Sequence, residues 1–421
     1  MINNELKIID SVCTGCSACT EACVFEKNNE KPLQLTVNKK NLNVPRINAE
    51  ACRKCMMCFR VCPSEAKNIS SEISFENYIN KLGNCYYGYS LDFEHRFESA
   101  TAGIVTETAA YLLDTKHVDG VVSSYQNEDN EIITEIFTDS AEVKKTRGSI
   151  YRQVPVLNGI LKKIESGNFK KLLFIGLPCQ IAGLKMLLKI NKQFAKIDFI
   201  FISLFCKQTK TEEFSDYERK ILKAKPNEKI NYRGQGWTGV TSVKSGQSLP
   251  FTNIKFSLMW GSFAFTPDYC FACCDPLGAN ADISVGDAWL KEYYSDKAGS
   301  SVFITNSEKG RKIIEEIAAA KKIFIKNETK ENIIKSQDLS YIKFKTSNIG
   351  ERIAFFGNLK NCKRYPLRFK ILFYWIKLNK KIVENIYSKS LIFFIPEFLL
   401  KIYGRIITFV FAKTISRSLK K

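Results

Sequence analysis

The middle of the chain alternates between short apolar runs and longer amphipathic segments. Runs with the length and composition of buried strands are found at residues 118–123, 132–137, 171–176 and 197–205. Helical spacing of apolar positions is found at residues 102–113, 154–164 and 179–188. Because strands this apolar must be covered on both faces, the pattern predicts a mixed α/β domain with helices on both sides of a sheet.

Nearer the N-terminus, an alternating stretch at residues 33–42 predicts a short hairpin between two cysteine runs. Both runs have the spacing Cys-x2-Cys-x2-Cys-x3-Cys. In this spacing, three thiolates on one loop bind one 4Fe-4S cluster, and the fourth thiolate, on a helix, reaches a second cluster. The spacing assigns Cys13, Cys16, Cys19 and Cys62 to one cluster, and Cys52, Cys55, Cys58 and Cys23 to the other.

Zinc is the alternative for these cysteines, but four-ligand zinc sites use two Cys-x2-Cys pairs rather than triple runs. The paired runs therefore predict a ferredoxin-type module, and hence a protein that transfers single electrons. A polar stretch around residues 67–71 follows the second run and indicates the end of this module.

The length of 421 residues predicts two or three domains. Fifteen cysteines would suggest disulfides in a secreted protein, but the first residues contain no apolar stretch long enough for export. We therefore expect a cytoplasmic protein with reduced thiols.

The net charge of +20 is concentrated in the last part of the chain. Residues 363–421 contain 14 Lys and Arg against two Glu, a balance of +12, which leaves +8 for the other residues. This distribution is typical of a moderately basic enzyme with a basic tail and argues against a nucleic-acid partner.

Within that tail, residues 398–416 form a helical pattern with Lys401 and Arg405 on one stripe and apolar residues over the rest. Pro396, Glu397 and the two cations interrupt every run that is long enough to span a bilayer. Basic amphipathic helices suit an anionic membrane surface, and they equally suit packing on the protein itself or on a second subunit. Peripheral contact of residues 363–421 with the inner face of the membrane is therefore one of two open predictions.

Only two histidines are present, His95 and His117, and we expect each at the surface or at a helix cap. Residues 234–239 match the pattern Gly-x-Gly-x-x-Gly, but a strand-like segment follows them. A dinucleotide fingerprint needs a helix whose N-terminus faces the pyrophosphate, so we reject a Rossmann nicotinamide site.

A second group of cysteines lies in the predicted α/β domain. Cys179 follows one apolar strand, Cys206 ends another, and Cys270 and Cys273 form a Cys-x2-Cys pair. Because parallel strands end at the same edge of a sheet, these four thiols are candidates for one metal site. Buried free cysteines are the equally supported alternative.

The segment from residue 85 to about 304 resembles the family of beta subunits of coenzyme F(420)-reducing hydrogenases and dehydrogenases, which also includes the plant hydroxymethyl chlorophyll a reductase. The resemblance rests on seven motifs in the same order, at residues 99–103, 147–151, 176–184, 205–206, 232–237, 270–273 and 281–289. With the N-terminal module it extends to about residue 355, and the basic tail lies outside it.

This resemblance implies a third 4Fe-4S cluster and a bound FAD. The cluster ligands it implies are Cys179, Cys206, Cys270 and Cys273. The flavin-binding residues it implies are Ser99, Thr101, Gly103, Arg147, Gly148, Ser149 and Tyr151. The chain departs from the family pattern at Ala100, Ala102 and Leu177, and Cys274 follows the second cysteine of the pair.

We therefore predict an α+β or α/β protein with a ferredoxin module (1–76), two parts of a flavin and iron-sulfur unit (77–168 and 169–358), and a helical basic tail (359–421). Electrons would pass from the module through the third cluster to FAD and a deazaflavin-like or other small substrate. A redox partner, either a ferredoxin or a dehydrogenase subunit, is implied, and no catalytic acid or base is assigned. The alternatives are an electron-transfer subunit without its own substrate and a reductase in surface-polysaccharide synthesis.

Overall fold

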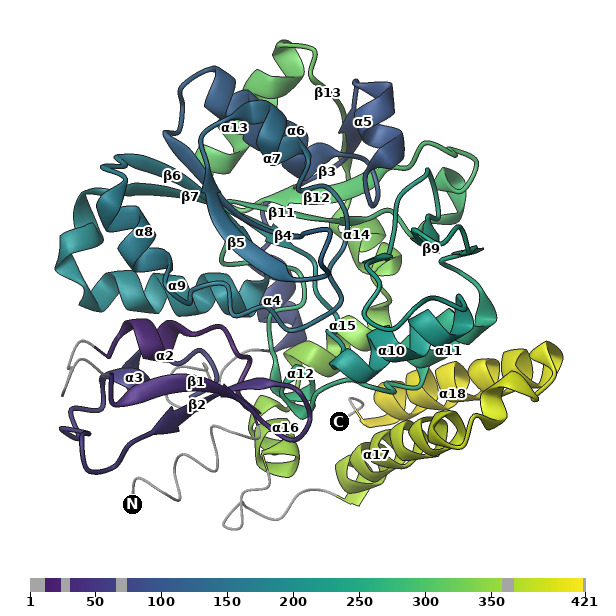
Figure 1. Cartoon of the computed structure of the whole chain (residues 1–421). Coiled ribbons are helices and arrows are strands. Elements are labelled where there is room, and N and C mark those ends of the chain that lie inside the picture. The colour runs from purple at the N-terminus through teal and green to yellow at the C-terminus, as the bar shows by residue number, and fades with distance from the viewer. Residues whose placement is uncertain (1–11, 24–30, 66–73, 358–366, 419–421) are drawn as a thin grey trace.

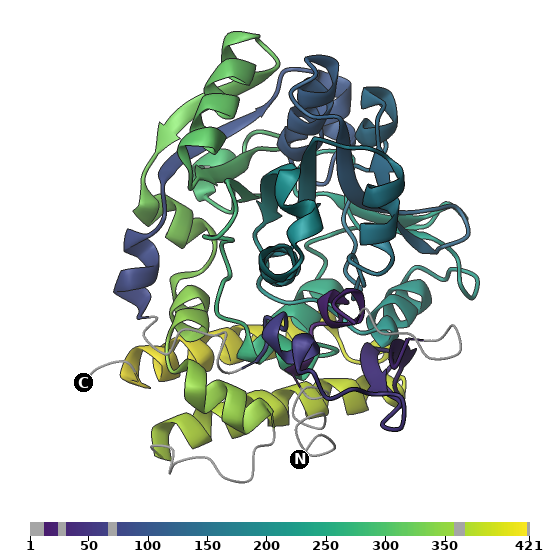
Figure 2. The ribbon, with the colours of Figure 1, turned by 90° about the vertical axis from the view of Figure 1, so that its left-hand side faces the viewer.

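A computed structural model describes residues 12–23, 31–65, 74–357 and 367–418 of the protein. An eight-stranded sheet with helices on both faces lies at the centre, and a small cysteine-rich module and a C-terminal pair of helices lie below it (Figures 1 and 2). The predicted mixed α/β architecture with a helical tail is confirmed. The linker predicted near residues 67–71, Cys362 and residues 363–366 of the tail lie outside the described residues.

The described part of the cysteine-rich module contains a hairpin and two single-turn helices. Its elements are α2 (Ala18–Glu21), β1 (Leu33–Val37), β2 (Asn43–Ile47) and α3 (Met57–Arg60). β1 and β2 pair antiparallel from Leu33 opposite Ile47 to Val37 opposite Asn43. The predicted hairpin is confirmed, although its second strand begins one residue after the stretch that predicted it.

The strands of the central sheet lie in the order β13-β3-β12-β11-β7-β6-β4-β5. Their bounds are β3 (Asn84–Ser90), β4 (Gly120–Gln126), β5 (Ile132–Phe137), β6 (Lys171–Gly176), β7 (Asp198–Leu204), β11 (Ile283–Asp287), β12 (Ser301–Thr305) and β13 (Ile323–Glu328). β4, β6, β7 and β11 run parallel, and the other pairings are antiparallel. The parallel strands therefore end at one common edge.

Helices cover both faces of this sheet. Their bounds are α4 (Phe75–Asn80), α5 (Phe93–Glu98), α6 (Ile104–Asp114), α7 (Ser140–Lys144), α8 (Ile160–Ser166), α9 (Pro178–Ile190), α13 (Glu308–Ala319) and α14 (Lys330–Ser336), with short 3-10 turns η2 (Lys192–Lys196) and η3 (Lys291–Tyr293). Leu172 and Phe174 of β6 are buried with α8 and α9, whereas Leu173 and Ile175 are buried with α6 and α13. This alternation explains why the strand is apolar throughout.

One predicted helix starts later than expected. Residues 154–164 were predicted to be helical, but α8 begins at Ile160. Val154 precedes Pro155, and a residue before proline is disfavoured in the helical region. Gly159 then takes a φ of 75°, so the helix cannot extend towards the N-terminus through it.

The remaining elements form a layer below the parallel strand ends. They are α10 (Glu212–Ile221), β8 (Ile230–Asn231), β9 (Val240–Val243), β10 (Ser248–Pro250), α11 (Ile254–Gly261), α12 (Asp268–Ala272), α15 (Leu339–Thr346), α16 (Ile349–Phe356), α17 (Leu367–Ser388), η4 (Leu391–Phe393) and α18 (Glu397–Ser418). β8 precedes the glycine-rich residues 234–239 and β9 follows them. No helix begins there, as the rejection of a Rossmann site requires.

The two C-terminal helices pack against the body of the protein. Phe373 and Ile376 of α17 and Phe411 of α18 are buried in a cluster with aromatic residues of α15 and α16. The helices also contact each other, because Trp375 stacks on Phe411 with ring centroids 6.4 Å apart. Packing on the protein, one of the two predictions for this tail, is therefore confirmed for one face of each helix. Among the described residues, no helix is long and apolar enough to cross a membrane.

Candidate metal centres and ligand cavity

The two N-terminal cysteine loops have the same backbone conformation. The third and fifth residues of each run are left-handed, with φ of 69° at Gly15, 71° at Ser17, 56° at Lys54 and 61° at Met56. In each loop the amide of the third residue donates to the sulfur of the first cysteine at 3.4 Å. The repeated spacing in the sequence thus folds into two copies of one loop.

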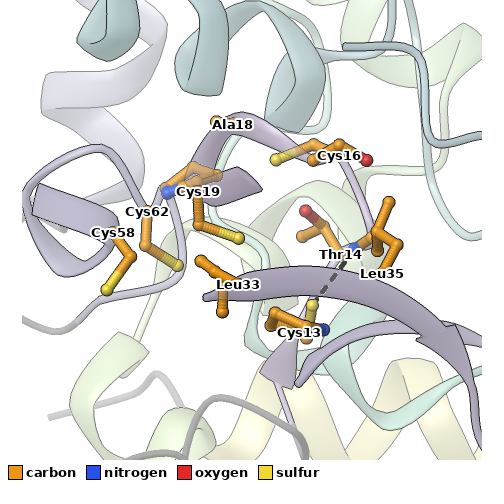
Figure 3. A pocket seen from close by; sticks show the side chains of 13 residues that line it. Cys13, Thr14, Cys16, Ala18, Cys19, Leu33, Leu35, Cys58 and Cys62 are labelled. Carbon is orange, nitrogen blue, oxygen red and sulfur yellow. Dashed lines mark hydrogen bonds between the residues drawn. The ribbon is translucent and has the colours of Figure 1, made fainter. Parts of the chain in front are cut away.

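The first cysteine set encloses a single space. The side chains of Cys13, Cys16, Cys19 and Cys62 surround it, and the sulfur of Cys58 points away from it (Figure 3). Burial raises the pKa of the Cys62 thiol, and the neighbouring Cys13 and Cys16 raise it further. The structure therefore brings together the four residues that the spacing assigned to one cluster.

The second set lies beside it. Cys23, Cys52, Cys55 and Cys58 line a common cavity. Burial raises the pKa of Cys58 to about 11, with further contributions from the other three cysteines. Cys55 is the exposed member of this set. This group is therefore the one that is nearest to solvent.

The third set forms where the parallel strands end. Cys179 is the second residue of α9 after β6, Cys206 follows β7, and Cys270 and Cys273 lie in α12 and at its C-terminal end. Burial raises the pKa of Cys179 well above its usual value, and the largest charge contributions come from Cys273 and Cys206. The convergence expected from the strand order is present. Cys273 rather than Cys274 is the neighbour that perturbs Cys179 and Cys206.

Two buried cations hold the backbone of this Cys-x2-Cys pair. The ammonium of Lys345 in α15 donates to the carbonyl of Cys270. The guanidinium of Arg352 in α16 donates to the carbonyls of Phe271 at 2.5 Å and Cys273 at 2.8 Å. Lys345 also lowers the pKa of Cys206 against the larger effect of burial. Positive charge beside these thiols favours the thiolate form, which is the form that ligates metals.

The three sets lie in a series. Burial is the largest cause that raises the pKa of Cys19, and Cys58 is among the groups that raise it further. Burial is also the largest cause that raises the pKa of Cys179, and Cys16 is among the groups that raise it further. The amide of Leu157 donates to the carbonyl of Cys16 at 3.1 Å, which fixes the module against the α/β domain. The order is therefore second set, first set, third set.

Beyond the third set lies a cavity of about 630 Å³. Its walls include Cys206, the loop before α6, the loop between α7 and α8, and residues of β11, α11, α15 and α18. All seven residues that the resemblance assigned to a flavin line it, namely Ser99, Thr101, Gly103, Arg147, Gly148, Ser149 and Tyr151. Ala100, Ala102 and Leu177, where the chain departs from the family pattern, line the same cavity.

The loop before α6 is shaped by Gly103, whose φ is 73°. A Cβ at this position would lie 2.9 Å from Cδ2 of His95, so only glycine fits without displacing the imidazole. The expectation that His95 lies at the surface or at a cap is wrong. Its ring is buried and its Nε2 lies 2.8 Å from the hydroxyl of Thr106, because α5 folds back against the start of α6.

Not every predicted flavin residue has a free side chain. The hydroxyl of Ser99 donates to the carbonyl of His95 at 2.6 Å, and the hydroxyl of Thr101 donates to the carboxylate of Asp287. Arg147 and Gly148 are exposed at the cavity wall. Arg147 and Gly148 therefore offer a ligand one exposed cation and a backbone loop, while the hydrogen bonds of Ser99 and Thr101 fix the loop before α6.

The cavity wall contains an ion pair, to which the sequence assigned no role, between a buried arginine and a half-buried aspartate. Nη1 of Arg233 lies 2.6 Å from Oδ2 of Asp287, which also accepts from the indole of Trp289 at 3.1 Å. The guanidinium also lies over the Phe251 ring, 4.6 Å from its centroid. Burial lowers the pKa of Arg233, but Asp287 and Tyr151 together have a larger effect and raise it. Arg233, Asp287 and Trp289 stand in two of the motifs on which the resemblance rests, so those motifs were the sequence signal that could have identified them.

The donor sets suit iron-sulfur clusters. Each contains four cysteines, and at Cys58, Cys62 and Cys206 burial combined with neighbouring thiols raises the pKa. Crowded thiolates of this kind are stabilised by cationic iron. Among the described residues, no group of three or more His, Cys, Asp or Glu is placed to hold a single metal ion.

Comparison with known proteins identifies the larger part of the chain. The N-terminal part of the coenzyme F420 hydrogenase/dehydrogenase beta subunit matches residues 85–160, and the C-terminal part matches residues 169–331. The chain belongs to this family of beta subunits. Residues 12–67 match a 4Fe-4S dicluster domain, so this family member carries an iron-sulfur module.

Curated relatives agree with that assignment. A component of the F(420)H(2) dehydrogenase of Methanosarcina mazei is 23% identical over 307 residues, covering 69% of this chain and 81% of the relative. The coenzyme F420-dependent sulfite reductase of Methanocaldococcus jannaschii is 26% identical over 369 residues, covering 80% of this chain and 53% of that protein. The dicluster domain and these oxidoreductase relatives support an iron-sulfur oxidoreductase.

A solved structure shows the same fold. A chain of the F420-reducing NiFe hydrogenase complex from Methanosarcina barkeri, studied as a xenon derivative, superposes with a TM-score of 0.50 at 18% identity. The match covers 66% of this family member and 92% of that chain. At this identity the likeness concerns the fold, and it supports the mixed α/β architecture described above.

Proposed function

We propose that this protein is an iron-sulfur flavoprotein oxidoreductase that connects a one-electron protein partner to the two-electron conversion of a small molecule. The observation that carries the proposal is the series of three four-cysteine sets, which runs from the exposed Cys55 to Cys206 in the wall of the large cavity. Bound iron-sulfur clusters supply one-electron transfer, and a bound FAD supplies the exchange of single electrons for a hydride.

The proposed ligands follow the geometry of the three sets. Cys13, Cys16, Cys19 and Cys62 hold one 4Fe-4S cluster, Cys52, Cys55, Cys58 and Cys23 hold a second, and Cys179, Cys206, Cys270 and Cys273 hold a third. Backbone amides donate to sulfur in each set, the third set receiving one from Thr209 to Cys270 at 3.4 Å. Such bonds and the degree of burial are the means by which a protein tunes cluster potentials.

The proposed FAD site is the part of the cavity between α6 and the loop at Arg147 and Gly148. Backbone amides at the start of α6 are free to donate to a phosphate, and the small residues before it allow a close approach. Arg147 adds an exposed cation at the same wall. Asp287 of the Arg233–Asp287 pair accepts a hydrogen bond from the hydroxyl of Thr101, and this contact positions the loop in front of the helix.

The proposed redox partner approaches the second cysteine set, because Cys55 is exposed there. Arg53 and Lys54, which belong to the same loop, are also exposed. A negatively charged redox protein is the partner whose charge complements this surface. The relative named as a component of an F(420)H(2) dehydrogenase suggests a protein of such a complex as the partner, and a deazaflavin as the small substrate.

Anaerobic purification with assays for iron, sulfide and flavin tests the proposal. Three cubane clusters and one FAD predict about 12 iron atoms and one flavin per chain. The purified protein, once reduced by a chemical donor, should then reduce added coenzyme F420. Roughly eight iron atoms per chain without flavin would contradict the proposed third cluster and FAD. Full iron and flavin content without turnover of coenzyme F420 would show that only the proposed substrate is wrong.

A further inference from the structure

The two C-terminal helices and the turn between them carry most of the exposed large apolar side chains of the described residues. In the part of the chain that the structure describes, twelve of the twenty exposed large apolar side chains lie between residues 367 and 409. Phe394, at the turn between the helices, is 81% exposed. Contiguous exposed apolar surface of this kind marks an interaction site rather than an ordinary protein surface.

On α17 the exposed residues form one stripe. Leu367, Ile371, Tyr374 and Leu378 are exposed and are separated by three or four residues, which places them on one side of the helix. Ile382 continues the stripe by one further turn. The opposite side is buried in the protein core, so this stripe points away from the body.

α18 carries a second stripe of the same kind. Phe398, Ile402, Ile406 and Phe409 are exposed and again recur at intervals of three or four residues. The residues on the other side of this helix are buried against α11, α15 and α17. Each helix is therefore apolar on two sides, one buried and one open.

Positive charge flanks both stripes. Exposed Lys377 and Lys381 border the stripe of α17, and exposed Lys401 and Arg405 border that of α18. Residues 367–418 contain ten Lys and Arg against two Glu. One of these, Glu384, accepts from the amide of Phe265 at 2.8 Å and so faces the body of the protein.

We propose that α17, η4 and α18 dock this protein on the surface of an anionic lipid bilayer. Apolar side chains that point outwards enter the boundary between headgroups and acyl chains, while the flanking Lys and Arg pair with lipid phosphates. The charge of the two helices favours this occupant over a second copy of the chain, whose equally basic helices would repel them.

The docking helix α18 also contributes to the ligand cavity. Phe411 and Thr408 are part of the cavity wall. One helix thus presents Phe409 to the proposed lipid surface and Thr408 and Phe411 to the cavity. The docked orientation therefore places the cavity wall directly behind the membrane-facing helix, and this inference does not depend on which cofactors the cavity holds.

The test is sedimentation of the full-length protein, with its bound cofactors, on vesicles of phosphatidylcholine with and without phosphatidylglycerol. We expect binding to the anionic vesicles, at least about tenfold weaker binding to the neutral ones, and loss of binding at high salt. The double variant Ile402→Glu/Phe409→Glu should bind at least about tenfold more weakly than the wild type.

A matched control uses Leu91→Glu/Phe93→Glu. Leu91 and Phe93 are 49% and 67% exposed, against 49% and 63% for Ile402 and Phe409. Phe93 begins α5 and Leu91 lies two residues before it, and α5 is on the opposite side of the sheet from α17 and α18 (Figure 1). The control variant should bind vesicles like the wild type. Equal binding of all three proteins, or no binding by any, would overturn the proposal. Light scattering that shows a wild-type dimer dissolved by Ile402→Glu/Phe409→Glu would overturn it as well, in favour of a contact between copies.

Discussion

Gly183 of α9 lies directly against the sulfur of Cys16. A Cβ at position 183 would lie 3.1 Å from that Sγ and 3.2 Å from the Cβ of Ala18. Gly183 is one helical turn beyond Cys179, so the same helix carries a ligand candidate of the third set and the surface on which the first set rests. The absence of a side chain at this position is what allows the module and the α/β domain to approach so closely.

Replacing Gly183 with Leu should therefore separate the two cysteine sets. We expect electron transfer from the first cysteine set to the third to slow at least about tenfold, because the added side chain has no space beside Cys16 and must displace the module. Stopped-flow reduction through the module, followed at the flavin absorbance, measures this rate. Lys189→Leu, at an exposed position of the same helix, is the control and should leave the rate unchanged.

Adjacent cysteines provide a sharp test of the third set. Cys273→Ser should lower the iron content from about 12 to about eight atoms per chain, because one of four ligands is lost. Cys274→Ser should leave it unchanged, since Cys274 is not among the neighbours that perturb Cys179 or Cys206. Iron and sulfide analysis after anaerobic purification distinguishes the two. Equal losses in both variants would show that the assignment of Cys273 is mistaken.

The basic loop at the second set predicts a salt-dependent partner. Arg53→Gln/Lys54→Gln should lower kcat/KM for an acidic ferredoxin by roughly three- to tenfold at low ionic strength, and the difference should vanish at high salt. Lys321→Gln/Lys322→Gln is a matched control, because Lys54 and Lys321 share a φ of 56° and all four side chains are exposed. A similar loss in the control would indicate a general charge effect rather than a docking site.

The buried imidazole of His95 predicts a pH dependence of stability. Burial lowers its pKa below the usual 6.5, with a further lowering by Lys144. Below pH 6.5 the unfolded chain therefore binds a proton that the folded protein excludes, so the free energy of unfolding falls as pH decreases from 6.5 towards the folded pKa. A tenfold difference in proton affinity between the folded and unfolded states corresponds to about 1.4 kcal/mol.

Thermal unfolding at pH values from about 7.5 down to about 6 measures this effect. The variant His95→Gln has no titrating group at this position, so its Tm should fall less over that range than the Tm of the wild type. Parallel curves for the two proteins would show that another group is responsible. His117→Gln, at an exposed imidazole, is the control and should follow the wild type.

Elements whose conformation depends on residues close together in the chain could be predicted from the sequence. The spacing of each N-terminal cysteine run predicted a loop, and both loops adopt one conformation with left-handed residues at equivalent positions. The apolar runs at residues 132–137 and 171–176 predicted β5 and β6 with their observed bounds. The late start of α8 was missed because apolar periodicity at 154–164 outweighed the local effect of Pro155 and Gly159.

Other features depend on residues that are far apart in the chain. Cys179, Cys206 and Cys270 come together because β6 and β7 are neighbouring parallel strands and buried Lys345 holds the segment of Cys270 against them. The spacing of these cysteines left a metal site and buried free thiols equally supported, and only the strand order brings the sulfurs together. The burial of His95 likewise depends on the contact between α5 and α6.

The sequence by itself determined the two cysteine loops, the strands of the α/β domain and the family, because repeated spacing and apolar periodicity are properties of short segments. Only the tertiary structure decided that the three cysteine sets lie in a series, that Gly183 joins the first to the third, and that one face of each C-terminal helix stays open. These features arise from packing between distant segments, whose relative positions no local pattern encodes.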